Sequence, residues 1–172
     1  MFKPLPSDFD LTKLKGARIR LAALICVQTA VKVRDLLELN TEDIIEWENN
    51  LPVIKEHIKA AGRDVWLPKP LRAEILAYIR RYGTEAGPLF KTTLDGRRWP
   101  YHNARLAWYW NSRQAGLEGR YGLDSIYATA LKNWFALTDN MEARIAFTGL
   151  PRAQVRHAER LINKQRGLDA AV

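Results

Sequence analysis

The alternation of hydrophobic and polar positions predicts one helical domain that contains a few short strands. Residues Arg18 to Thr29 are apolar on nearly every side, which predicts a helix buried at the centre of the domain. A second helix is predicted over Lys32 to Leu39, where apolar residues recur at helical spacing between charged ones. The polar residues Asn40 to Asp43 end this helix.

Short extended segments follow. Residues 44–47 and 52–54 are separated by Glu48-Asn49-Asn50, and asparagine tolerates positive φ, so this pair is typical of a β-hairpin. Ala60-Ala61-Gly62 forms a second turn, and Val65 to Leu67 supplies a third strand. We therefore expect a small three-stranded antiparallel sheet.

The rest of the chain is predicted to be helical, over Pro70–Tyr82, Tyr101–Ala115, Asp124–Leu137, Met141–Phe147 and Pro151–Gln165. Asp124 is the expected N-cap of the third of these helices, and Gly167 lies just past the expected end of the last. Trp99 is expected to fix the start of the helix at residue 101 by packing. We expect the aromatic residues on the helices to be in the core: Trp108, Tyr109, Trp110, Trp134 and Phe135. The predicted fold class is α+β and mainly α, with an N-terminal extension over 1–16, the domain over 17–166 and a tail over 167–172.

Composition and charge narrow the possible functions. The chain has 172 residues, and 27 Lys and Arg against 19 Asp and Glu give a net charge of +8, which favours nucleic acid over membrane as a partner. The single cysteine, Cys26, excludes an internal disulfide, and the three histidines show no metal-ligand spacing. No apolar run approaches the roughly 20 residues that span a bilayer, and the N-terminus lacks a secretory segment. We expect a cytoplasmic protein that needs no cofactor and no metal.

Two groups of basic residues are candidates for DNA contact. The last predicted helix carries four cations at i, i+4 spacing on one face: Arg152, Arg156, Arg160 and Lys164. Like charges at that spacing repel one another, and bound phosphates would offset the repulsion, although a solvated surface helix has the same pattern. The second group consists of Arg97 and Arg98, with Arg105 in the helix that follows.

Several local motifs resemble those of the tyrosine recombinase (phage integrase) catalytic domain. Thr29 to Leu39, followed by Glu42-Asp43-Ile44, is similar to the family signature in which a Thr-Gly-Leu-Arg turn opens a helix. Arg63 to Pro68 resembles the third strand of the family, and Gly87-Pro88-Leu89-Phe90 its Pro-Leu-Phe connector. Thr148-Gly149-Leu150 stands where the family has Leu-Gly-His. The resemblance spans residues 17 to 163 and implies the fold of that catalytic domain.

The resemblance also implies which site residues are present and which are lost. In the family a tyrosine attacks the scissile phosphate, two arginines clamp its oxygens, a lysine protonates the leaving oxygen and histidines assist. Lys32 holds the first arginine position, Asp35 keeps the acidic partner, and Lys59 lies in the turn region of the catalytic lysine. The second arginine position falls between Leu123 and Tyr127, which contains neither histidine nor arginine, and no tyrosine follows Tyr127. The register of the nucleophile falls near Glu159, so the resemblance implies a protein that is not an enzyme.

These observations predict a non-catalytic, nucleoid-associated protein that binds double-stranded DNA as a regulator or accessory factor of a phage, plasmid or integrative element. The DNA-binding residues expected are Lys32, Lys59, Arg97, Arg98, Arg105, Arg152, Arg156, Arg160 and Lys164. One alternative is a divergent site-specific recombinase with an unusual nucleophile, although no neighbouring base points to Tyr127. Another is a protein-interaction module in which Arg152 to Val172 docks onto a recombinase or a second copy. No membrane partner is expected.

Overall fold

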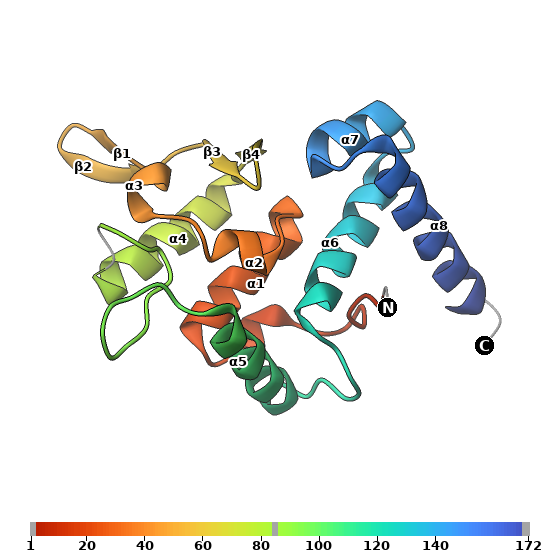
Figure 1. Ribbon diagram of the computed structural model, residues 1–172, viewed down its shortest axis with the longest axis horizontal. Helices are drawn as coiled ribbons and strands as arrows, with labels where there is room; N and C mark the ends of the chain where they lie inside the picture. The colour runs from red at the N-terminus through yellow and green to blue at the C-terminus, as the bar shows by residue number, and fades with distance from the viewer. Residues whose placement is uncertain (1–2, 84–85, 170–172) are drawn as a thin grey trace.

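The fold is built around the buried helix α1 (Ala17–Thr29), as the computed structural model in Figure 1 shows for residues 3–83 and 86–169. Helices α2, α4, α5 and α6 all contact α1. No residue of α1 is exposed, and its fully buried side chains cover more than half of the helix surface: Ile19, Leu21, Ala22, Ala23, Ile25, Cys26 and Thr29. The central buried helix expected from the sequence is confirmed.

The remaining helices also follow the pattern in the sequence. A short 3-10 helix, η1, precedes α1 at Leu11–Lys13. Two helices of four residues follow α1, and then the five longer helices of the domain: α2 (Val33–Leu36), α3 (Thr41–Ile44), α4 (Lys69–Tyr82), α5 (Tyr101–Gln114), α6 (Leu123–Leu137), α7 (Met141–Thr148) and α8 (Arg152–Asp169). The fold class is therefore α+β and mainly α, as expected.

Three helix ends differ from the prediction. The helix expected over Lys32–Leu39 is helical only from Val33 to Leu36. Asp124 is not an N-cap, because Gly122 takes that position. Asp124 lies in the first turn of α6, where its negative charge interacts favourably with the positive end of the helix dipole. Helix α8 continues through Gly167 to Asp169, because one glycine in a helix costs only about 1 kcal/mol.

The strands form two separate hairpins, and the expectation of one three-stranded sheet is wrong. Strand β1 (Ile45–Glu48) pairs with β2 (Leu51–Ile54), and β3 (His57–Ala60) pairs with β4 (Arg63–Trp66). The linking residues extend the two ladders: the amide of Lys55 donates to Ile44 O, next to the first hairpin, and Glu56 O accepts from the amide of Leu67, next to the second. Each linking residue thus continues its own hairpin, and β2 does not pair with β3.

Most of the core lies between α1 and the elements packed around it. Only some of the aromatic residues that were expected in the core are buried there. Trp99 and Trp108 are buried, so the packing role expected for Trp99 is confirmed. The N-terminal segment joins this core through Leu5, whose amide donates to Thr129 Oγ1 at 2.8 Å. Tyr109 and Trp110, both expected in the core, lie on the outer face of α5 and are 44% and 61% exposed. The helix turns Trp108 inward, and the two residues after it necessarily point elsewhere.

A second, smaller core joins α8 to α6 around Val155, Ala158 and Ile162. Helix α8 thus packs its apolar face against α6. It lies at the right-hand edge of Figure 1. No helix in the described part of the chain has the length and apolar character needed to cross a membrane.

Arg144 is the polar centre of this second core. Its side chain is only 6% exposed, and its guanidinium donates to Glu159 Oε1 at 2.7 Å and to the carbonyl oxygens of Phe135 and Thr138. The same group also forms an ion pair with Asp139 at 3.2 Å. Glu159 of α8 therefore serves to hold α7 to α8.

Replacing Arg144 should destabilise the protein strongly. We expect Arg144→Ala to lower the free energy of unfolding by about 3 kcal/mol, because it leaves Glu159 and two carbonyl groups without their buried partner. Urea denaturation followed by circular dichroism measures this change. Arg113→Ala, which removes an exposed arginine, is the matched control and should change the same quantity by less than about 0.5 kcal/mol. Equal stabilities for the two variants would contradict the role of Arg144.

Candidate nucleic-acid interface

A hollow at the start of α2 gathers several of the residues singled out by the sequence. Its volume is about 360 Å³, and α2, α5 and α6 supply its walls. The lining residues are Lys32, Val33, Arg34, Asp35, Tyr101, Leu123, Asp124 and Tyr127. We refer to it as the Lys32 hollow.

The end of α1 places Lys32 at this hollow. Ala30 ends the helix in the left-handed conformation, with φ of 51°, and its amide donates to Cys26 O at 2.9 Å. The chain then extends through Lys32, which is the N-cap of α2 and is exposed. Arg34 follows two residues later and lies 4.7 Å from the centre of the Tyr101 ring of α5. Two cations of one short segment therefore lie where three helices meet.

Tyr127 lies in the same hollow, beside Lys32. The Lys32 Nζ atom is 5.2 Å from the centre of the Tyr127 ring. Burial raises the pKa of the Tyr127 phenol to about 12; the nearby Cys26 and Asp35 raise it further and Arg63 opposes them. The phenol is therefore protonated at neutral pH. The sequence does not indicate a chemical neighbour for Tyr127, because Lys32 is far from it along the chain and only the fold brings the two together.

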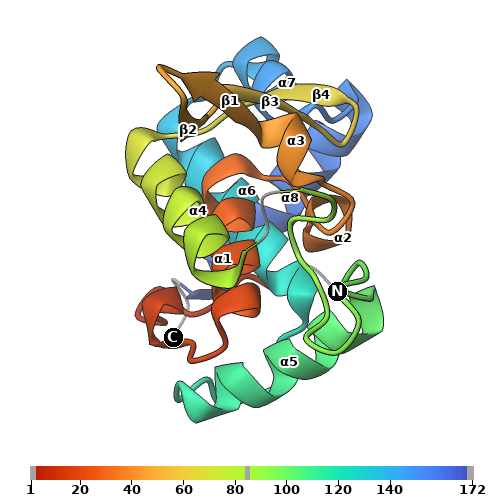
Figure 2. The ribbon, with the colours of Figure 1, turned by 90° about the vertical axis from the view of Figure 1, so that its left-hand side faces the viewer.

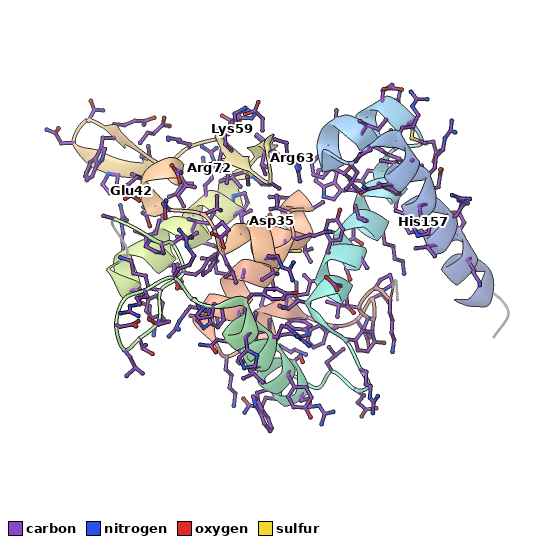
Figure 3. The ribbon with its side chains drawn as sticks, viewed as in Figure 1. Asp35, Glu42, Lys59, Arg63, Arg72 and His157 are labelled. Carbon is purple, nitrogen blue, oxygen red and sulfur yellow. The ribbon has the colours of Figure 1, made fainter. Side chains whose placement is uncertain are left out.

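Arg63 of β4 is a residue whose position the sequence did not reveal. Its Nη2 atom donates to the carbonyl oxygens of Thr29 at 2.7 Å and Ala30 at 3.1 Å, and burial lowers the pKa of its guanidinium. Figure 3 shows Arg63 between the second hairpin and α7. There it leaves no room for a side chain at Gly149, where a Cβ atom would collide with Arg63 Cδ. Arg63 thus joins the second hairpin, the end of α1 and the link from α7 to α8.

Four of the predicted DNA-binding residues are paired with other groups of the protein, three of them outside α8. Lys59 forms a cross-strand ion pair with Asp64 at 2.7 Å, and this partner lowers the pKa of the aspartate. Arg97 pairs with Asp95 at 3.3 Å. Arg98 is half-buried and donates to Leu37 O at 2.5 Å and Asn40 Oδ1 at 2.8 Å, which ties its loop to the end of α2. A sequence reveals these charges but not the partners that the fold gives them.

Arg105 lies on the surface next to the Lys32 hollow. With His102, Leu106, Tyr109 and Tyr121 it lines a second hollow of about 300 Å³ beside α5, which we call the α5 hollow. Leu123 lines both hollows, and Tyr101 and His102 are consecutive, so the two adjoin. Lys32, Arg34, His102 and Arg105 therefore lie along one surface.

The cations of α8 are exposed but line neither of these hollows among the residues described. Their face is opposite the buried Val155, Ala158 and Ile162, and Arg152 forms an ion pair with Glu142. In Figure 3, Lys59 lies at the top of the molecule on the second hairpin, Asp35 near its centre and His157 on α8. The predicted DNA-binding residues thus divide into a cluster around Lys32 and Arg105 and several outlying positions.

Comparison with known proteins assigns the fold. No family model and no curated protein matches the sequence. Among solved structures, XerA recombinase matches with a TM-score of 0.71 and 13% sequence identity over 95% of this chain and 63% of that one. XerH site-specific recombinase bound to its difH substrate before cleavage matches with a TM-score of 0.65 and 19% identity, over 91% of this chain and 51% of that one. XerH after cleavage of a palindromic difH substrate matches with a TM-score of 0.69 and 19% identity, over 99% and 53%.

The chain therefore has the fold of tyrosine recombinases and spans between half and 63% of the solved chains that it matches. The resemblance noted in the sequence is confirmed at the level of the fold. The prediction that the protein is not an enzyme is wrong as it was drawn, because the structures that share its fold are recombinases. Missing motif residues do not show that the chain lacks activity, and two tyrosines, Tyr101 and Tyr127, line the hollow beside Lys32.

The shifted pKa of Tyr127 predicts how the protein responds to alkaline pH. An unfolded tyrosine titrates near pH 10, so the buried neutral phenol stabilises the fold fully below about pH 10. This contribution is lost as the pH rises through about 12. Absorbance titration of phenolate should therefore show a late phase, shared with Tyr78, that loses half its amplitude in Tyr127→Phe. Tyr109→Phe, at an exposed position, should leave that phase intact, and an unchanged late phase in Tyr127→Phe would contradict the assignment.

Proposed function

We propose that the protein binds double-stranded DNA through the surface that runs from the Lys32 hollow along the first half of α5. The observation that carries this proposal is that the fold gathers Lys32, Arg34, His102 and Arg105 on one surface. The XerH structures of the same fold contain their difH substrate, which supports DNA as the ligand. DNA binding on this surface fits a regulator or accessory factor of a phage, plasmid or integrative element, associated with the nucleoid.

The charges on α5 suit a polyanionic ligand. The helix contains no Asp or Glu over its 14 residues, and Arg105 has no carboxylate partner among the described residues. Lys32 likewise forms no ion pair within that part of the chain, and its contact is the Tyr127 ring. Cations that the protein leaves unpaired can neutralise phosphates and release the counterions condensed on DNA, which provides the driving force for binding.

The outlying cations are proposed as secondary contacts. Lys59, Arg97 and Arg152 each have a carboxylate partner within the protein, and Arg98 holds the end of α2. A phosphate would have to compete with these partners, so each of the four contributes less to DNA affinity than Lys32 or Arg105. Arg156, Arg160 and Lys164 of α8 are exposed and extend the basic surface beyond the primary cluster.

Electrophoretic mobility shift of a duplex at several salt concentrations tests the proposal. Lys32→Ala and Arg105→Ala should each weaken binding about tenfold at low salt, and each should reduce the slope of log K against log[salt] by about 0.9 for the phosphate contact that is lost. Arg80→Ala is the matched control, since it removes an exposed arginine from α4, and it should change neither quantity. No binding by the wild type at low salt, or an equal loss in all three variants, would overturn the proposal.

One observation favours a second candidate function, DNA strand transfer with an unusual nucleophile. Tyr127 lies beside Lys32, and the carboxylates of Asp35 and Asp124 line the same hollow. In such a reaction the phenol oxygen bonds to phosphorus, the bond from phosphorus to a sugar oxygen breaks, and the leaving oxygen gains a proton. Because burial raises the pKa of the phenol, a carboxylate must take the phenolic proton as the bond forms.

A nicked suicide duplex tests this second function, because the released strand diffuses away and traps a covalent adduct. Strand transfer by Tyr127 predicts an adduct, resolved on a denaturing gel, that forms with the wild type and is absent from Tyr127→Phe. Tyr121→Phe, which leaves the Lys32 hollow unchanged, should retain the adduct. An adduct that persists in Tyr127→Phe, or none with the wild type, would rule out Tyr127 as a nucleophile and leave the DNA-binding proposal standing.

A further inference from the structure

The acidic residues of this basic protein are concentrated around the first hairpin. Six of the 19 Asp and Glu residues lie between Glu38 and Glu56, where Lys55 is the only basic side chain. A protein with a net charge of +8 therefore has one strongly acidic segment. Such a segment repels DNA, so the proposed DNA-binding function does not explain it.

The tip of this hairpin is also strongly apolar. Trp47 is 68% exposed and Leu51 62% exposed, and they lie on opposite faces of the β1–β2 ladder, in which Trp47 is paired with Pro52. Glu46 and Glu48 lie on the same face of the hairpin as Leu51, whereas Trp47 lies on the face turned toward α4. Both glutamates are exposed and form no ion pair within the described residues. Large apolar side chains at an exposed hairpin tip are unfavourable in water and are typical of an interaction site.

The outer face of α5 has the opposite charge and a similar apolar content. Leu106 is 46% exposed and Trp110 61% exposed, and both lie on the same side of the helix as Arg105 and Arg113. Arg113 lies 4.4 Å from the centre of the Tyr109 ring, which lines the α5 hollow. Arg113 has no carboxylate partner in the part of the chain that the structure describes. This face thus combines an aromatic hollow with unpaired cations.

The hairpin and α5 are too far apart to meet within one molecule. The hairpins lie at the top of the molecule and α5 at the bottom, both in Figure 1 and in the perpendicular view of Figure 2. Contact between two such surfaces therefore requires two molecules. Because the surfaces are different, the contact is head-to-tail, and it leaves one free surface of each kind at the ends of an open assembly.

We propose that the protein associates with itself head-to-tail, with the β1–β2 hairpin of one copy docked on the outer face of α5 of the next. Leu51 enters the α5 hollow, which has a volume of about 300 Å³ and an aromatic lining. Glu46 and Glu48, on the same face as Leu51, lie against Arg113 and Arg105, so that each unpaired charge gains a partner of opposite sign. The contact is small and partly electrostatic, so it is weak, concentration-dependent and sensitive to salt. Arg105 and the α5 hollow also belong to the proposed DNA-binding surface, so DNA and a second copy compete for this part of α5.

Sedimentation velocity without DNA, at low salt and over a range of protein concentrations, tests the proposal. The weight-average mass of the wild type should rise with concentration. Glu46→Lys with Glu48→Lys in one protein, and Arg113→Glu in another, should each weaken association by at least about tenfold. An equimolar mixture of these two proteins should recover association, because the lysines of one then lie against the glutamate of the other.

Matched controls separate this contact from a general effect of charge or apolar surface. Asp8→Lys changes an exposed acidic residue elsewhere and should leave association unchanged. Leu51→Ala should abolish association, whereas Trp47→Ala, on the opposite face of the hairpin, and Leu94→Ala, at the 99% exposed tip of another loop, should not. A wild type that stays monomeric at every concentration, or charge-reversed proteins that do not recover association when mixed, would overturn the proposal. If Arg113→Glu weakens DNA binding and leaves self-association intact, α5 binds nucleic acid along its whole length and the proposal is wrong.

Discussion

The whole candidate site depends on the way in which α1 ends. The helix stops at Ala30, a residue with a Cβ atom held in the left-handed conformation at a cost of about 1 kcal/mol. The last carbonyl groups of a helix lack partners within it, and Arg63 supplies two hydrogen bonds to those of Thr29 and Ala30. The chain then leaves the core in an extended conformation, and Lys32 is the second residue after this turn. A side chain from a distant hairpin thereby determines where the first cation of the proposed DNA-binding surface lies.

The helices could be predicted from the sequence because each carries its own signal. The apolar pattern of α1 and the left-handed glycine that ends α4 are local features, and both helices lie within a residue or two of the expected bounds. The pairing of strands is not local. Two hairpins and one three-stranded sheet have the same turns and the same alternation, and the difference lies in whether β2 pairs with β3, which it does not.

In the candidate site, too, features of neighbouring residues could be predicted and contacts between distant residues could not. Lys32 and Asp35 could be predicted from a motif of neighbouring residues, and both line the hollow. Tyr127 could not, since its relevance comes from contact with Lys32, and nothing in its own sequence neighbourhood marks that contact. Arg98 and Arg105 look equivalent in the sequence, yet one is bound to backbone carbonyl groups and the other is free to meet a ligand. A sequence does not show which partner each charged side chain acquires on folding.

Partners also explain why the charges of this protein are arranged as they are. Arg63, Arg98 and Arg144 are engaged with carbonyl or carboxylate oxygens, and each joins elements that are distant along the chain. Among the described residues, Lys32 and Arg34 at the hollow, Arg105 and Arg113 on α5, and Glu46 and Glu48 on the first hairpin form no ion pair. An unpaired charge contributes little to the stability of a fold, so its value to the protein is in binding. The basic surface is the one proposed to bind DNA, and the acidic face of the hairpin is its counterpart in the proposed contact between copies of the chain.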